Sequence, residues 1–130
     1  MHSPEIESII EQAVGLAKVR SHQYCTVEHL LLALINYAPF KKCIDSYGIN
    51  TEAMNKDIEL YLDSLLAITV QLEPGQEIQP RKTNSLERVM NRSVTQVLFT
   101  GRKVVTTVDL YLSISAVSYT HLTLPTIYSV

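Results

Sequence analysis

Apolar residues near the start of the chain recur every three or four positions, which is the spacing of one face of an α-helix. The positions of this stripe are Ile6, Ile9, Ile10, Ala13, Val14 and Ala17. Ser3 and Pro4 precede it, a pair typical of a helix N-terminus because the hydroxyl can accept a hydrogen bond from an unpaired backbone N–H. We therefore expect a first helix whose apolar face is buried against a core.

The next helix is predicted to begin at Thr26, which can cap it, with Glu28 in the first turn where the helix dipole favours an acid. Residues 30–35 read Leu-Leu-Leu-Ala-Leu-Ile and are apolar on every side of a helix. Such a pattern predicts a helix that is buried all round.

The rest of the first half predicts two more helices. We expect Pro39 to end the second helix and residues 40–47 to form a short third one. Asn50 or Thr51 is expected to cap a fourth helix that runs to about residue 66. This part of the chain thus predicts a four-helix unit.

Residues 67–84 break the helical pattern. They contain Pro80 and a Pro-Gly pair without sustained periodicity, so they are predicted to be a linker. After the linker, Ser85 is expected to cap a fifth helix, and Thr106 or Thr107 a sixth.

An internal repeat is the clearest structural signal, because a shift of 80 residues superimposes the stripe of the first helix on that of the fifth. The residues that match the first stripe are Leu86, Val89, Met90, Ser93, Val94 and Val97. The same shift places Thr26 on Thr106 and Leu32 on Leu112. We therefore expect two related helical units, with Leu32 and Leu112 buried in equivalent places.

The second unit stops short of the first. From residue 119 the chain reads YTHLTLPTIYSV, which has no helical stripe, so counterparts of the third and fourth helices are missing. A truncated reading frame or an added tail would explain such an ending. We expect this tail, rich in β-branched residues, to cover the apolar face of the fifth and sixth helices, on its own chain or exchanged with a neighbour in a dimer.

Residues 26–34, Thr-Val-Glu-His-Leu-Leu-Leu-Ala-Leu, follow a T-x-E-H-L-L-x-A-L pattern. This pattern resembles the signature of Clp amino-terminal (Clp-N) domains, and the likeness is strongest to the ClpA-type branch, over about residues 3–117. The resemblance implies an all-α fold of two pseudo-repeated helical units, the second one truncated. The implied division is a Clp-N-like domain at 1–118, with repeat one at about 3–66, the linker at 67–84 and an incomplete repeat two at 85–118, followed by a non-family tail at 119–130.

Clp-N domains of this branch are tethered to an AAA+ ring that feeds a peptidase, and they bind adaptors. The resemblance therefore implies a docking module for a ClpS-type adaptor or protein substrates, with the ring and peptidase as partners if the chain is part of a full-length subunit. The positions that match adaptor-facing residues are Gln23, Glu28, Pro80, Arg81, Lys82 and Thr83. Gln23 and Glu28 are expected to lie on one exposed patch beside residues 80–83.

Composition and charge narrow the function further. The chain has 130 residues, of which 46% are hydrophobic and 18% charged, as in globular domains. Its net charge is −2, and its basic residues are spread out without aromatic neighbours, which argues against nucleic-acid binding. The longest apolar run is too short to cross a membrane, and neither a leader nor a disulfide framework is indicated, so the expected location is the cytoplasm.

Enzymatic chemistry has little support in the sequence. It contains no G-x-x-x-x-G-K-[ST] loop, so we expect no ATPase site and no cofactor in this chain. The alternative is a small metal-binding or thiol-dependent protein, because His22, Cys25, Glu28 and His29 fall within eight residues. Their spacing matches no standard zinc site, and a cysteine beside an apolar helix is more often packed than reactive. The main hypothesis is therefore a docking module without catalytic or metal-ligating residues.

Overall fold

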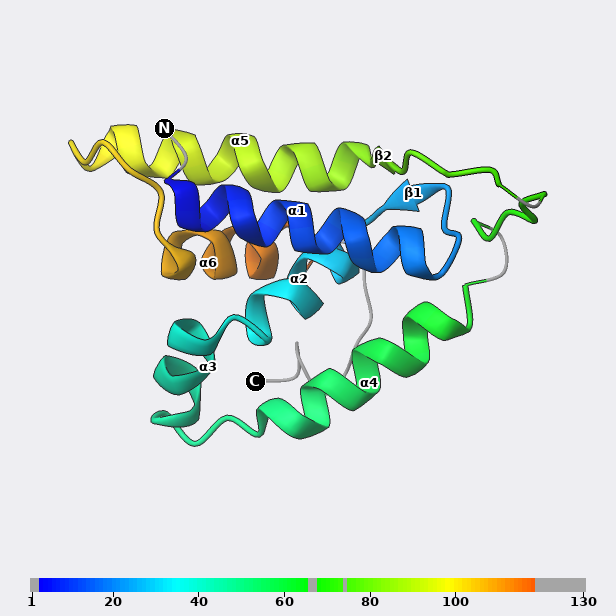
Figure 1. Ribbon diagram of the computed structural model, residues 1–130. Helices are drawn as coiled ribbons and strands as arrows, with labels where there is room; N and C mark the ends of the chain where they lie inside the picture. The colour runs from blue at the N-terminus through cyan, green and yellow to red at the C-terminus, as the bar shows by residue number, and fades with distance from the viewer. Residues whose placement is uncertain (1–2, 66–67, 74, 119–130) are drawn as a thin grey trace.

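The computed structural model describes residues 3–65, 68–73 and 75–118, and this part of the chain consists mainly of helices (Figure 1). The elements in chain order are α1 Pro4–Val19, β1 Tyr24–Cys25, α2 Val27–Ile35, α3 Ala38–Asp45, α4 Thr51–Asp63, β2 Arg81–Lys82, α5 Asn84–Phe99 and α6 Thr107–Ser118. The prediction of an all-α fold is confirmed. Over the same residues, no helix has both the length and the apolar character needed to span a bilayer.

Helix α2 forms the centre of the domain. All nine of its residues are buried, and it packs against each of the other five helices in the described chain. This position follows from the sequence, since a helix that is apolar on every side is most stable when neighbours cover it completely. In Figure 1, α1 and α5 run along one side of α2, and α3 and α4 lie on the other.

The repeat is visible in the burial of α1 and α5. Four positions of each stripe are buried and two are partly buried, in the same order along both helices. The matched buried pairs are Ile6 and Leu86, Ile9 and Val89, Ala13 and Ser93, and Ala17 and Val97. The shift read from the sequence therefore relates two structurally equivalent helices.

The start of α5 corrects a sequence prediction. Thr83, not Ser85, is the N-cap, since its hydroxyl accepts a hydrogen bond from the backbone N–H of Leu86 at 3.1 Å. Ser3 accepts from the N–H of Ile6 at 3.3 Å in the same way, so the caps also follow the shift. The helix thus begins inside the segment predicted as a linker.

Pro39 does not end α2, as we expected from the sequence, but lies in the first turn of α3. Proline fits there because the first backbone N–H groups of a helix have no partner within the helix. Helix α2 already ends at Ile35, with Asn36 as its C-cap. For α4, one of the two predicted caps is correct: the side chain of Asn50 accepts a hydrogen bond from the backbone N–H of Ala53 at 3.0 Å.

The linker is tied to the loop between α1 and α2. The backbone N–H of Gln23 donates to the carbonyl of Ile68 at 2.6 Å, and that of Val70 donates to the carbonyl of Ser21 at 2.8 Å. Farther along the linker, β2 pairs in parallel with β1. The linker is thus held near both of its ends by backbone hydrogen bonds, which its irregular sequence did not indicate.

Within residues 75–118, the second unit has fewer helices than the first. In the first unit α4 packs on α2, and Leu32 is 1% exposed. No helix in residues 75–118 takes the corresponding place on α6, and Leu112 is 53% exposed. The expected burial of Leu112 is therefore wrong, because no helix among the described residues covers its position. The predicted covering tail and exchanged dimer concern residues 119–130, which lie outside the described residues.

Candidate functional site

The β1–β2 ladder brings together most of the residues expected to face an adaptor. The backbone N–H of Arg81 donates to the carbonyl of Gln23 at 3.0 Å, and that of Thr83 donates to the carbonyl of Cys25 at 3.1 Å. Segments that are far apart in the sequence are thus adjacent in the structure, as the resemblance implied.

We call Gln23, Pro80, Arg81, Lys82 and Thr83 the ladder surface. The side chains of Gln23, Arg81 and Lys82 are exposed, and those of Pro80 and Thr83 are half-buried. Two exposed cations on a backbone held by hydrogen bonds can meet the carboxylates of a partner. Thr83 also has a structural role, since it caps α5.

Glu28 does not belong to this exposed surface, which corrects the sequence prediction. It is 8% exposed, and burial raises the pKa of its carboxyl group. Burial and, to a smaller extent, the charge of Glu28 raise the pKa of the Tyr61 hydroxyl, so Glu28 lies near α4. The physical reason is the place of Glu28 in the first turn of α2, the helix that the other helices cover on all sides.

His22 and His29, two residues of the metal or thiol alternative, form a buried pair. His22 Nδ1 and His29 Nε2 are 2.8 Å apart, and the backbone N–H of Thr26 donates to His29 Nδ1 at 2.9 Å. Since Nδ1 of His29 accepts, its Nε2 carries the proton of the neutral ring and donates it to His22. Burial lowers the pKa of both rings, that of His29 to about 4. This chain of hydrogen bonds requires both rings to be neutral.

The four clustered residues do not converge on a metal site. A structural zinc ion takes four ligands, and a catalytic one takes at least three from the protein. Within the described ranges, no group of three or more His, Cys, Asp or Glu side chains could hold a metal ion. The nitrogens that His22 and His29 direct at each other are already engaged in a hydrogen bond. The pair is therefore best explained as part of the helix start.

The second unit has an ion pair where the first has the histidine pair, because the repeat aligns His22 with Arg102 and His29 with Asp109. Arg102 donates to both carboxylate oxygens of Asp109, at 2.7 and 2.9 Å. The backbone N–H of Thr106 donates to Asp109 at 2.9 Å, as that of Thr26 does to His29. In each unit, a side chain in the first turn of the second helix thus accepts from the backbone of the threonine cap. A side chain seven positions earlier in the sequence binds that first-turn residue: His22 binds His29, and Arg102 binds Asp109. Neither pair was predicted from the sequence, although the 80-residue shift aligns the two residues of one pair with those of the other.

Cys25 is expected to resist alkylation in the native protein while Cys43 reacts. Cys25 is fully buried, and burial raises the pKa of its thiol to about 11, so very little thiolate is present at neutral pH. Cys43 is exposed. Mass spectrometry after brief iodoacetamide treatment should find the label on Cys43 alone, and on both cysteines in denaturant. Rapid labelling of native Cys25 would contradict this expectation and support the thiol alternative.

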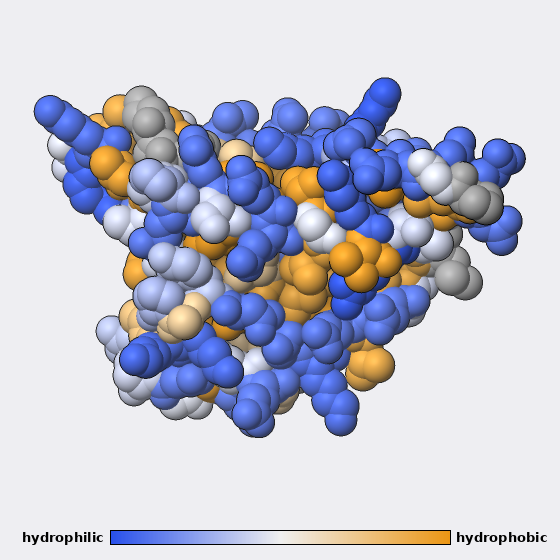
Figure 2. All heavy atoms as spheres, in the orientation of Figure 1, coloured by the Kyte–Doolittle hydropathy of each residue, from blue (hydrophilic) through white to orange (hydrophobic). Residues whose placement is uncertain are grey.

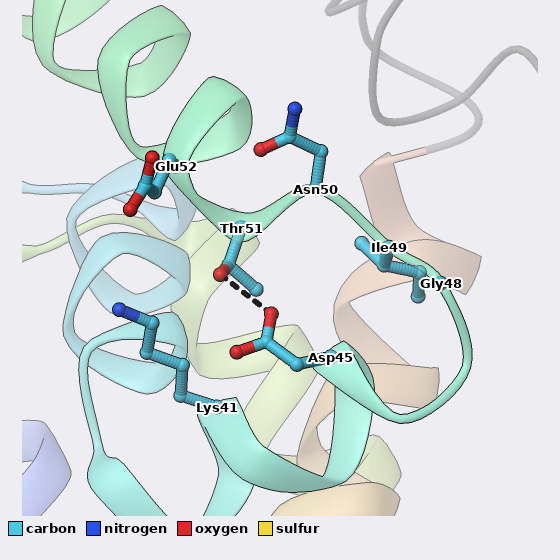
Figure 3. A pocket seen from close by; sticks show the side chains of 7 residues that line it. All are labelled: Lys41, Asp45, Gly48, Ile49, Asn50, Thr51 and Glu52. Carbon is cyan, nitrogen blue, oxygen red and sulfur yellow. Dashed lines mark hydrogen bonds between the residues drawn. The ribbon is translucent and has the colours of Figure 1, made fainter.

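A separate hollow of about 440 Å³ lies at the turn between α3 and α4 (Figure 3). Its lining includes Lys41, Asn50 and Glu52. The hydroxyl of Thr51 donates to Asp45 Oδ1 at 2.8 Å, and this bond ties the end of α3 to the start of α4. None of the residues expected to bind an adaptor lines the hollow, so we assign it to the geometry of the turn.

Comparison with known sequences agrees with the signature. The model of the Clp repeat (R) N-terminal domain family matches residues 1–123. A ClpA homolog protein from Fuscovulum blasticum is 32% identical over 114 residues, which make up 88% of this chain and 14% of that protein. The chain thus spans only 14% of the length of this curated relative.

Solved structures share the fold, and two of them match nearly the whole of this chain. The N-terminal domain of the ClpV1 ATPase from the E. coli EAEC Sci1 T6SS is 17% identical with a TM-score of 0.81, and the match covers 98% of this chain and 74% of that one. The Hsp104 N-terminal domain from Candida albicans is 17% identical with a TM-score of 0.72, and the match covers 98% and 87%. Because the family model also matches nearly the whole chain, this protein belongs to the Clp repeat N-terminal domain family.

Proposed function

We propose that this Clp-N domain is a docking module that delivers adaptors or protein substrates to a Clp-type AAA+ unfoldase and catalyses no reaction itself. Membership of the family supports a docking role. The single observation that carries the proposal is the β1–β2 ladder, which holds Gln23 beside residues 80–83 on one exposed surface. In a full-length subunit, an AAA+ ring and its peptidase would receive what the domain binds.

The proposed partner of the ladder surface is a ClpS-type adaptor with carboxylates that face Arg81 and Lys82. Both cations are exposed, and the paired backbone beneath them is already ordered, so little conformational entropy is lost on binding. Glu28 is buried and would act on adaptor binding only indirectly, by supporting the start of α2.

Isothermal titration of the domain with a ClpS-type adaptor tests this proposal. We expect saturable, equimolar binding that weakens as the salt concentration rises, because exposed charges are screened. The absence of binding by a domain that circular dichroism shows to be folded would rule out ClpS-type adaptor docking.

Reversing both charges of the ladder surface is expected to weaken adaptor binding. The variant Arg81→Glu/Lys82→Glu should lose about 1–3 kcal/mol of binding free energy, or roughly five- to 150-fold in Kd, because two cations that meet carboxylates are replaced by anions that repel them. Titration calorimetry gives the affinities. The matched control is Arg88→Glu/Arg92→Glu, which changes the net charge equally on exposed positions of α5. Equal losses in both variants would mean that overall charge, and not the ladder surface, decides binding.

A further inference from the structure

The β1–β2 ladder leaves one edge of β2 without a neighbouring strand among the described residues. Successive residues of an extended strand direct their backbone N–H and C=O groups to opposite edges. The backbone N–H groups of Arg81 and Thr83 donate towards β1. The backbone N–H and C=O of Lys82, between them, therefore point away from β1.

This outer edge of β2 offers three backbone groups to a further strand. They are the N–H and C=O of Lys82 and the C=O of Pro80, which has the same direction as Lys82 along the strand. Pro80 has no N–H, so an added strand can donate to it but cannot accept from it. Proline and lysine at an edge also prevent indiscriminate pairing with other strands. The outer edge is thus open and selective.

The two faces of this edge differ in charge. Lys82 lines a hollow of about 270 Å³ together with Glu7 and Glu11 of α1, so on its face one cation stands beside two acids. The side chain of Arg81 lies on the opposite face, because side chains alternate along a strand. Arg81 is exposed and takes part in neither ion pair of the part of the chain that the structure describes. A partner strand is therefore best matched by carboxylates on the Arg81 face.

The surroundings of β2 also favour polar recognition. In Figure 2, hydrophilic side chains predominate along the upper edge of the molecule, where Figure 1 places β2 and α5. A partner at this place gains more from backbone hydrogen bonds and charge than from burial of apolar surface.

We propose that an extended segment of a partner protein pairs with the outer edge of β2 as a third strand of the ladder. Its backbone bonds to Lys82 and Pro80, and an acid at every second position faces Arg81. This inference rests on the proposed docking function, since the edge belongs to the ladder surface, and it names the form in which a partner binds there. Few backbone groups take part, so such a segment alone binds weakly.

The probe is an end-capped peptide in which glutamate alternates with threonine, and nuclear magnetic resonance of the domain follows its binding. We expect saturable binding with a Kd of about 1 mM or tighter. Hydrogen exchange of the Lys82 amide should slow in the complex, because this N–H becomes bonded. Lys103, at the repeat position of Gln23, gives the reference amide and should not change. The absence of a saturable shift at the Lys82 amide would overturn the proposal.

Methylation of the backbone nitrogens of the peptide tests strand pairing directly. Only every second residue of an added strand directs its N–H towards β2. Methylation of one alternating set should therefore weaken binding at least about tenfold, while methylation of the other set is tolerated. With the glutamates on the Arg81 face, the sensitive set is the threonines if the added strand is antiparallel and the glutamates if it is parallel. Equal effects of the two sets would overturn the proposal.

Lys82→Pro tests the edge from the side of the protein. It removes the outward N–H of residue 82, whereas the ladder bonds run through the N–H groups of Arg81 and Thr83. Lys82→Ala is the matched control, because it removes the same cation and keeps the N–H. Lys82→Pro should bind the peptide at least about fivefold more weakly than Lys82→Ala. Equal affinities in two variants that circular dichroism shows to be folded would overturn the proposal, and the methylated peptides decide if Lys82→Pro does not fold.

The charge of the added strand is tested with a peptide that has glutamine in place of glutamate. It should bind the parent domain about threefold more weakly, and this difference should vanish in Arg81→Gln. A difference that persists in Arg81→Gln would show that the carboxylates do not face Arg81, and the proposed match of faces would be wrong.

Titration of a ClpS-type adaptor separates this inference from the proposed function. If the adaptor binds Lys82→Pro and Lys82→Ala with equal affinity, adaptor docking stands and strand addition at β2 is not its form. If the peptide pairs as expected and the adaptor does not bind, strand addition stands and ClpS-type docking is wrong.

Discussion

The Leu32→Ala variant is expected to lose about 2–5 kcal/mol of unfolding free energy, the usual range for removing a large buried side chain. Leu32 is 1% exposed and belongs to α2, the helix that every other described helix contacts. The deletion leaves a cavity between packed helices, which relax only partly. Urea denaturation, followed by the helical circular dichroism signal at about 222 nm, measures the loss of unfolding free energy.

Leu112→Ala is the matched control, because the repeat places it at the same position of α6. Leu112 is 53% exposed, so its truncation should change the unfolding free energy by less than about 1 kcal/mol. A loss as large as that of Leu32→Ala would show that residues outside the described ranges, or a partner, cover α6 in solution.

Lowering the pH from about 7.5 to about 5 is expected to reduce the unfolding free energy by about 2 kcal/mol through His29 alone. Burial, followed by the charges of His22 and Arg20, lowers the pKa of His29 from 6.5 to about 4. At a pH between these two pKa values, His29 carries a proton in the unfolded state but not in the native state. Stability is therefore full above pH 6.5 and falls as the pH drops towards 4. The lowered pKa of His22 acts in the same direction.

Two acids have shifted pKa values, and one of them, Glu28, modifies this dependence. Burial raises the pKa of Glu28, so the native state takes up its proton first on acidification, and this opposes the loss. Burial also acts to raise the pKa of Asp109, but hydrogen bonds from Arg102 and Thr106 outweigh it and lower that pKa from 3.8, so its effect falls below the tested range. Urea titrations at each pH measure the sum of these effects.

The His29→Gln variant isolates the histidine contribution. Glutamine is neutral throughout and is a natural partner of a threonine cap at this position of a helix. The variant should lose most of the difference between about pH 7.5 and about pH 5. An undiminished pH dependence in His29→Gln would assign the effect to other groups.

Sequence reasoning located the ladder surface only in part. It placed Gln23 and residues 80–83 together, and they are adjacent. It placed Glu28 beside them on the surface, and Glu28 is buried. A signature names residue types in order, but whether a first-turn acid meets water depends on which helices pack over it.

The sequence by itself determined the helices, the buried face of α1, the burial of residues 30–35 of α2 and the repeat that relates the two units. These features depend on interactions between residues three or four apart and on the balance of apolar and polar side chains, both of which can be read along the chain. Only the tertiary structure decided the exposure of Leu112, the burial of Glu28, the pairing of His22 with His29 and the β1–β2 ladder. Each of these depends on a loop that folds back or on a helix that is present or missing as a cover, and contacts of that kind leave no periodic pattern in the sequence.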